Sequence, residues 1–261
     1  WSEKCAAIRL MQGLQHDKFR IQPDVSVDAW LAAHPTASRQ HQLRRFMWEP
    51  LCIAALNTPV NDASAQVLAN VLRDSLASNR AASDFLLPQV DLSNLFPEPA
   101  ARFIESRGGR IYRQHRVTAL RREQNAWRLG DGLPYDHVIL AVAPYHLDTL
   151  VSGLGASVDH FAWEPIVTTY LTYPDDVQLP NPMLGVSDGH AQWLFDRGAL
   201  YGQRGLIAAV ISARGRHLDI SLAELEARIH LEIATLIPDL PDPIKVQTIT
   251  EKRATVCCVP N

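Results

Sequence analysis

Apolar residues in roughly the first 80 positions recur every three or four residues, which is the spacing of one face of an α-helix. The pattern predicts helices at Ser2–Gln15, at Val25–Ala33 with Ser26 as its cap, from Thr36 with an interruption at Pro50, and from a cap at Asn61 or Asp62 to Leu76. Hardly any strand-like alternation occurs in this region, so we expect it to be almost entirely helical.

Residues 97–144 show a different pattern, in which one helix is followed by short strands. Pro97 and Pro99 suit the first turn of a helix, where no backbone N–H is needed, and Gly108-Gly109 allow the left-handed backbone that ends one. The predicted strands are Arg110–Tyr112, Val117–Leu120, Ala126–Leu129 and Tyr135–Val142. The last of these is an almost unbroken apolar run, which is typical of a strand buried on both faces.

Strands dominate the remainder of the chain. The predicted elements are a short helix at Tyr145–Val151, a turn at Gly153–Ser157, strands at Ile166–Tyr173, Ala191–Gly198 and Gly205–Ala213, a helix from its Ser221 cap to Ile237, and one or two strands within Ile244–Val259. The three patterns together predict an α+β or α/β fold with boundaries at 1–95, 96–150 and 151–261.

The composition is that of a globular protein with a sizeable core, since 47% of residues are hydrophobic and 20% are charged. A net charge of -3, without a basic cluster beyond Arg44-Arg45 and Arg121-Arg122, argues against a nucleic-acid partner. The simplest interpretation of these two arginine pairs is that they lie on solvated faces. No apolar run approaches the roughly 18 residues of a membrane-spanning helix. The four cysteines lack zinc-ligand spacing and indicate reduced thiols, so we expect a cytoplasmic protein.

The segment that carries GGR-I, a strand opening on Arg116-Val117 and a later strand ending VILAVAP resembles the second FAD-domain segment of the flavin amine oxidase and phytoene desaturase superfamily. This resemblance implies that Val117 contacts the adenine side of FAD, and that Ala141, Val142 and Ala143 pass close to the cofactor. The alternative is an ordinary unit of one helix and a few strands.

A second stretch, FxWEPLCxAxLNT from Phe46 to Thr58, is denser in large side chains than a helical core requires. It resembles the squalene-associated FAD-dependent desaturases, also called hydroxysqualene dehydroxylases, and QWLFDRG around Trp193 resembles them too. The resemblance implies an apolar substrate tunnel bordered by Phe46, Trp48, Leu51 and Trp193. The alternative for the first stretch is packing at a helix junction.

The same resemblance implies a two-domain flavoprotein. Residues 1–95 and 151–261 would be the helical part and the sheet of its substrate domain, and 96–150 an incomplete FAD-binding, Rossmann-like segment. No GxGxxG motif, which would hold the FAD pyrophosphate, occurs in the sequence. We therefore expect the central part of a longer enzyme, which does not hold FAD tightly by itself.

Other chemistry finds little support in the sequence. There is no GxSxG, HExxH or P-loop motif, and Asp175-Asp176 does not recur as a magnesium-binding acidic pair, so no metal site is predicted. Scattered histidines are expected to be structural, with His190 in a surface loop. We name no catalytic side chain, because in the implied reaction the hydride comes from the flavin.

The leading hypothesis is an FAD-dependent oxidoreductase that acts on an isoprenoid lipid, converting hydroxysqualene to squalene in hopanoid supply. Two alternatives remain: an amine oxidase or carotenoid desaturase type of enzyme, and a non-catalytic module that binds a hydrophobic ligand. Expected partners are a lipid-like substrate, peripheral contact with the inner membrane, and a second copy of the chain paired along the sheet edge at 110–142.

Overall fold

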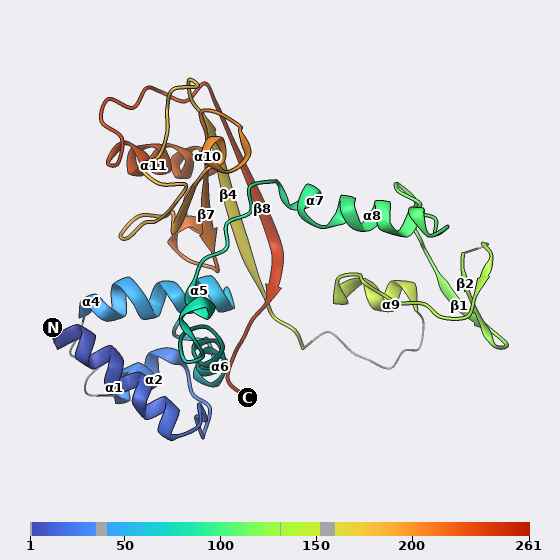
Figure 1. Cartoon of the computed structure of the whole chain (residues 1–261), viewed down its shortest axis with the longest axis horizontal. Helices are drawn as coiled ribbons and strands as arrows, with labels where there is room; N and C mark the ends of the chain where they lie inside the picture. The colour runs from blue at the N-terminus through green and yellow to red at the C-terminus, as the bar shows by residue number, and fades with distance from the viewer. Residues whose placement is uncertain (1, 35–40, 131, 152–159) are drawn as a thin grey trace. The chain divides into compact units, whose positions relative to one another are not determined.

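A computed structural model of the chain describes residues 2–34, 41–130, 132–151 and 160–261. These residues divide into two units, of which unit 1 comprises Trp1–Asp91 with Trp163–Asn261 and unit 2 comprises Leu92–Ala162 (Figure 1). The predicted strand-rich segment at 96–150 falls within unit 2. The predicted start of a helix at Thr36 and the predicted turn at 153–157 lie outside the described residues.

The first half of unit 1 is helical, as its periodicity predicts. Its elements are α1 (Ser2–His16), α2 (Val27–Ala33), α4 (His41–Leu43), a π-helical turn η1 (Arg44–Trp48), α5 (Glu49–Leu56), α6 (Ala65–Leu76) and a 3-10 turn η2 (Arg80–Ser83). The predicted cap of α2 is confirmed, because Ser26 accepts a hydrogen bond from the Ala29 N–H. The predicted cap of α6 is wrong: Ser64 accepts from the Val67 N–H instead of Asn61 or Asp62.

The helices share one apolar core, in which Val27, Leu31, Trp48, Leu68 and Leu72 are fully or almost fully buried. Each of these residues comes from the apolar stripe of its own helix, so packing of the stripes removes them all from water. The predicted interruption at Pro50 takes the form of the π-helical turn η1 directly before it. A proline nitrogen carries no hydrogen, and the wider turn accommodates the missing helical bond.

The second half of unit 1 is a five-stranded antiparallel sheet in the order β5-β6-β7-β4-β8. The strands are β4 (Trp163–Thr172), β5 (Met183–Gly185), β6 (Trp193–Asp196), β7 (Leu206–Ser212) and β8 (Lys245–Val256). They are joined by the helix α10 (Arg197–Tyr201), the 3-10 turn η4 (Arg216–Leu218) and the helix α11 (Leu222–Ala234). The predicted Ser221 cap of α11 is confirmed by its hydrogen bond from the Glu224 N–H.

The two faces of this sheet differ in character. One face packs on α11, which lies along one side of the sheet in Figure 1, and buries Val167, Leu171 and Ile207 against Ile229 and Ile233. The predicted helix ends at Ala234 instead of Ile237, and Leu222 and Leu236 remain exposed at 57% and 36%.

The second face, which we call the open face, follows from the strand register. Trp193 is paired with Val210, Phe195 with Ala208, and Ala208 with Tyr170. Side chains of directly paired residues share a face, as do side chains two positions apart on one strand. All of them except Ala208 are only half-buried. The open face therefore presents aromatic side chains that α11 does not cover.

Unit 2 has less regular structure than its sequence pattern predicts. It contains α7 (Leu92–Leu95), α8 (Pro97–Ser106), β1 (Leu120–Glu123), β2 (Ala126–Leu129), β3 (Pro134–Tyr135), a 3-10 turn η3 (Pro144–His146) and α9 (Leu147–Leu150). The three strands form one small antiparallel sheet in sequence order. The helix predicted from Pro97 to Gly108-Gly109 is confirmed over Pro97–Ser106, and so is the strand Ala126–Leu129, whereas Arg110–Tyr112 is not a strand.

The predicted buried strand at Tyr135–Val142 is also wrong. Only Tyr135 belongs to a strand, and Ile139, Leu140 and Val142 are exposed at 93%, 37% and 41%. Apolar side chains and backbone groups of a central strand are covered only when strands flank it on both sides. Among the described residues of unit 2, none pairs with this run beyond Tyr135.

Candidate functional site

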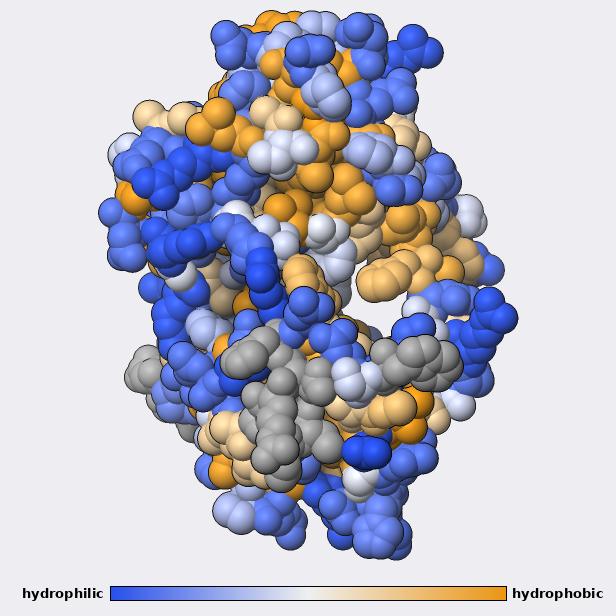
Figure 2. Space-filling view, turned by 90° about the vertical axis from the view of Figure 1, so that its left-hand side faces the viewer, coloured by the Kyte–Doolittle hydropathy of each residue, from blue (hydrophilic) through white to orange (hydrophobic). Residues whose placement is uncertain are grey.

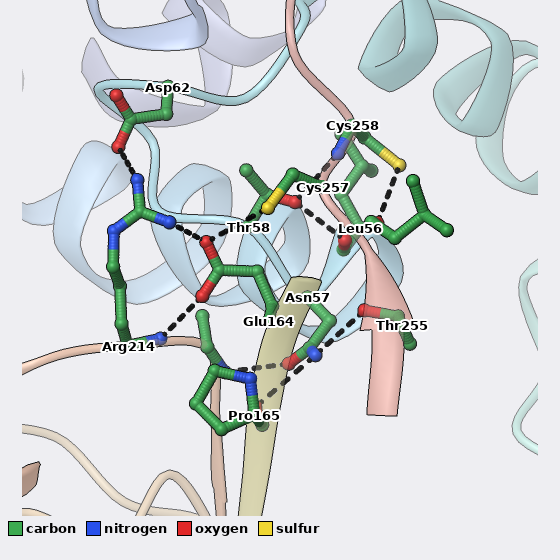
Figure 3. A network of polar contacts seen from close by, with 12 residues as sticks. Leu56, Asn57, Thr58, Asp62, Glu164, Pro165, Arg214, Thr255, Cys257 and Cys258 are labelled. Atoms are coloured by element: carbon green, nitrogen blue, oxygen red, sulfur yellow. Dashed lines mark hydrogen bonds and ion pairs between the residues drawn. The ribbon is translucent and has the colours of Figure 1, made fainter. Parts of the chain in front are cut away.

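The loop between α5 and α6 joins the helical half of unit 1 to its sheet through Asn57, which is 5% exposed (Figure 3). Its Oδ1 accepts a hydrogen bond of 2.6 Å from the Ala213 N–H, and its Nδ2 donates to Thr255 Oγ1 at 2.9 Å and to the Pro165 carbonyl at 3.3 Å. The neighbouring Thr58 hydroxyl accepts from the Cys258 N–H at 3.0 Å. Three distant segments, at Pro165, Ala213 and Thr255–Cys258, therefore meet at one side chain and its neighbour.

A buried carboxylate, Glu164, strengthens the same junction. It accepts a hydrogen bond of 2.8 Å from the Arg214 N–H and pairs with the Arg214 guanidinium, which also reaches Asp62 at 2.7 Å (Figure 3). The Cys257 thiol donates to Glu164 at 3.5 Å, and burial together with that carboxylate raises the pKa of Cys257. A thiol held protonated in this way is a poor nucleophile, so Cys257 is structural.

A cavity of about 850 Å³ lies in unit 1 between this helical half and the sheet. Its lining residues are Arg44, Arg45, Phe46, Glu49, Pro50 and Ile53 from η1 and α5, and Gly185–Gly189, Ala191–Trp193 and Arg216 from the sheet half. Figure 2 shows a side of the molecule on which hydrophobic residues gather above a hollow. The cavity is large enough for a ligand of drug-like or lipid-like size.

Four of the five charged side chains that line the cavity are paired with one another, and the fifth, Arg216, bonds backbone carbonyls instead. Arg44 bonds Glu49 at 2.6 Å and also bonds Asp28, and these hydrogen bonds raise the pKa of Arg44. Arg45 forms an ion pair with Asp188, and its guanidinium lies 4.9 Å from the ring centre of Phe46. The interpretation of Arg44-Arg45 as a solvated face is therefore incomplete, since both residues line the cavity. The sequence signal that could have placed them at the cavity is their position directly before Phe46 in the FxWEPL stretch.

The four residues predicted to border a substrate tunnel separate into two pairs. Phe46 and Trp193 line the cavity, whereas Trp48 is fully buried in the helical core and Leu51 packs against that core. Helix geometry explains the division: Phe46, Pro50 and Ile53 follow one another at i, i+4 and i+7 and so share a face. Trp48 lies on the other side of the same helix.

The four residues predicted to contact FAD lie in unit 2. Val117 and Ala143 are half-buried, and Ala141 and Val142 are exposed. A small cavity of about 240 Å³ in this unit is lined by Leu120, Trp127, His137, Val138, Leu140 and Val151, which include none of the four. The structure does not bring Val117 and Ala141–Ala143 to a shared pocket within the described residues.

The described part of unit 2 does not fit FAD by itself. A dinucleotide pyrophosphate needs backbone N–H groups at a helix N-terminus. The longest helix of this unit, α8, begins with Pro97 and Pro99, whose nitrogens have no hydrogen to donate. Over residues 2–34, 41–130, 132–151 and 160–261, moreover, no three His, Cys, Asp or Glu side chains meet in a metal-ligand arrangement. No helix in those ranges has the length and apolar character needed to cross a membrane.

Comparison with known proteins defines the class. The family described as flavin containing amine oxidoreductase matches residues 38–250, and the chain belongs to this family. The solved structure of putrescine oxidase bound to putrescine superposes with a TM-score of 0.69 at 17% identity, covering 94% of this chain and 61% of that one. Cyclohexylamine oxidase from Brevibacterium oxydans gives 0.62 at 14%, covering 92% and 57%. The α+β fold of an FAD-dependent amine oxidase is thus confirmed.

Curated relatives narrow the class further within this family. The hydroxysqualene dehydroxylase of Sinorhizobium fredii is 30% identical over 228 residues, which are 84% of this chain and 52% of the relative. That of Zymomonas mobilis is 26% identical over 223 residues, or 82% and 51%. The resemblance drawn from the FxWEPLCxAxLNT stretch is therefore confirmed. The chain spans about half the length of the curated relatives it matches.

Proposed function

We propose that the chain is the central part of an FAD-dependent oxidoreductase that acts on an isoprenoid lipid, with hydroxysqualene as substrate and squalene as product. The observation that carries this proposal is the cavity between η1–α5 and the open face, whose apolar wall comes from Phe46, Pro50, Ile53 and Trp193. The printed names of the curated relatives supply the substrate.

The residues of this chain contribute binding and shape in the proposed reaction. An apolar wall excludes water from a hydrocarbon chain, and the charges of Arg45 and Asp188 neutralise each other beside it. FAD, bound by the whole protein, would supply the hydride chemistry. We propose Val117 and Ala141–Ala143 as a surface that contacts FAD. We also propose that unit 1 is the substrate domain and unit 2 the FAD-side segment.

We also propose that unit 1 contacts a lipid surface, because its substrate would dissolve in one. Phe85 and Leu86 are exposed at 74% and 91%, and Leu87 and Val90 are only partly covered. Large apolar side chains gathered in one short segment are a usual means of interfacial binding. Liposomes should retain the protein, and the Phe85→Ser and Leu86→Ser variant should be released. If liposomes do not retain the protein and it is found only as a dimer, this apolar segment would instead bind a second copy of the chain.

The decisive experiment uses the complete reading frame from which this chain comes. After a reductant bleaches its flavin spectrum, hydroxysqualene should restore the spectrum and yield squalene. Trp193→Ala should raise KM about tenfold, because it removes a large apolar side chain from the cavity lining. The matched control Trp127→Ala, on the small sheet of unit 2, should not. Oxidation of a primary amine without any response to hydroxysqualene would favour the amine oxidase alternative and refute the proposal.

A further inference from the structure

The loop Val186–Gln192, which we call the wall loop, joins β5 to β6 and forms a large part of the cavity wall. A hydrogen bond of 2.9 Å from the Val186 N–H to the Gln192 carbonyl closes its ends. At its tip Asp188 has a φ of 69°, in the left-handed region that few residues adopt. Because the closing bond leaves the tip unsupported, groups from elsewhere in the chain must hold it.

Glu232 on α11 provides the central support. One carboxylate oxygen accepts the His190 N–H at 2.6 Å, and the other accepts the Ala191 N–H at 3.0 Å. Both bonds are charge-assisted and therefore stronger than bonds between neutral groups. Glu232 is not among the residues that line the cavity, so it acts on the wall from behind.

Two arginines complete this support. Arg216 donates to the carbonyls of Asp188 and Gly189 at 2.9 and 2.6 Å, so the carbonyls of the tip are held as well as its amides. Arg228 lies 3.2 Å from Nε2 of His190 and bonds Glu224 at 2.5 Å. Predicted to lie in a surface loop, His190 is in fact only 8% exposed. Its burial follows from this network, which turns the ring inward.

Gly189 shows how closely the carboxylate and the loop fit. A Cβ atom at this position would overlap the Glu232 carboxylate, well inside van der Waals contact distance, so that carboxylate would have to move. The φ of Gly189 is not in the left-handed region, so the close approach, and not the backbone conformation, calls for glycine here. The wall loop and Glu232 therefore constrain each other sterically as well as through hydrogen bonds.

We propose that Glu232 is a positioning residue for the cavity: it fixes the wall loop so that Asp188 meets Arg45 and Trp193 enters the lining. The identity of the ligand rests on the proposed function, but the positioning itself does not. The sequence offers one signal for this role, an Asp-Gly pair beside Trp193, yet nothing in it points to a partner 42 residues away.

The first test measures amide hydrogen exchange and farnesol binding in the full chain, with farnesol as a soluble isoprenoid probe. Glu232→Ala should accelerate exchange at His190 and Ala191 by about tenfold or more, since both amides lose their acceptor. It should also weaken farnesol binding about tenfold. The matched control is Glu226→Ala on the same helix, which removes a hydrogen bond from Thr248 and should change neither quantity.

The second test is a double-mutant cycle. Gly189→Ala alone should accelerate exchange across the wall loop, because the new methyl group displaces the carboxylate. In the Glu232→Ala background the same change should have no further effect, since the space is then free. Equal effects in both backgrounds, or unchanged exchange in Glu232→Ala, would overturn the proposal. If the cycle shows this coupling but the wild-type chain does not bind farnesol, the positioning role is supported and the isoprenoid cavity is refuted.

Discussion

Replacing Asn57 tests whether one side chain joins the helical half of unit 1 to its sheet. Asn57→Ala leaves the buried Ala213 N–H without its 2.6 Å acceptor, which costs about 1–3 kcal/mol. It also removes the bond to Thr255, for about 0.5–1.5 kcal/mol. The φ of 46° at this position adds about 1–2 kcal/mol for alanine. We expect the free energy of unfolding to fall by about 3–5 kcal/mol.

Two further variants separate these contributions. Asn57→Gly loses the same hydrogen bonds but tolerates the positive φ, so it should be about 1 kcal/mol less destabilising than Asn57→Ala. Asn61→Ala removes an exposed amide a few residues away and should stay within about 0.5 kcal/mol of the wild type. Urea unfolding followed by tryptophan fluorescence measures all three. A loss below about 1 kcal/mol for Asn57→Ala, with an unchanged urea slope, would refute the role of this junction.

Three other outcomes are expected. Burial lowers the pKa of both His190 and His217, so the folded state resists protonation, and stability should be lost as pH falls below about 6.5; a stability flat from pH 7 to 5 would contradict this. Gly205→Ala should destabilise by about 2 kcal/mol or more in a thermal melt, because φ is 69° and the Pro174 carbonyl would lie 2.7 Å from the new Cβ. The purified chain should show no flavin absorbance, and a yellow preparation with stoichiometric FAD would refute the reasoning on missing phosphate contacts.

Local pattern was sufficient where an element depends on its own residues. The helices α1, α2 and α11 and the strands β4 and β7 follow from periodicity, and Ser26 and Ser221 cap their helices with acceptors only three residues from their donors. The same holds for the family, since FxWEPLCxAxLNT and VILAVAP are short contiguous stretches that a resemblance can use even though VILAVAP does not form the predicted strand. A pattern within one short stretch indicates the backbone preference and the apolar face of that stretch, and these elements depend on nothing more.

Tertiary structure decided every feature that depends on distant partners. Ser64 caps α6 in place of Asp62, which pairs with Arg214, 152 residues away. The run Tyr135–Val142 is apolar enough for a buried strand, but burial requires neighbouring strands that a single stretch cannot supply. Helical phase placed Phe46 in the cavity and Trp48 in the core, although both are large and apolar. The wall loop takes its shape from Glu232, because a loop without a core of its own is fixed by whichever groups reach its backbone.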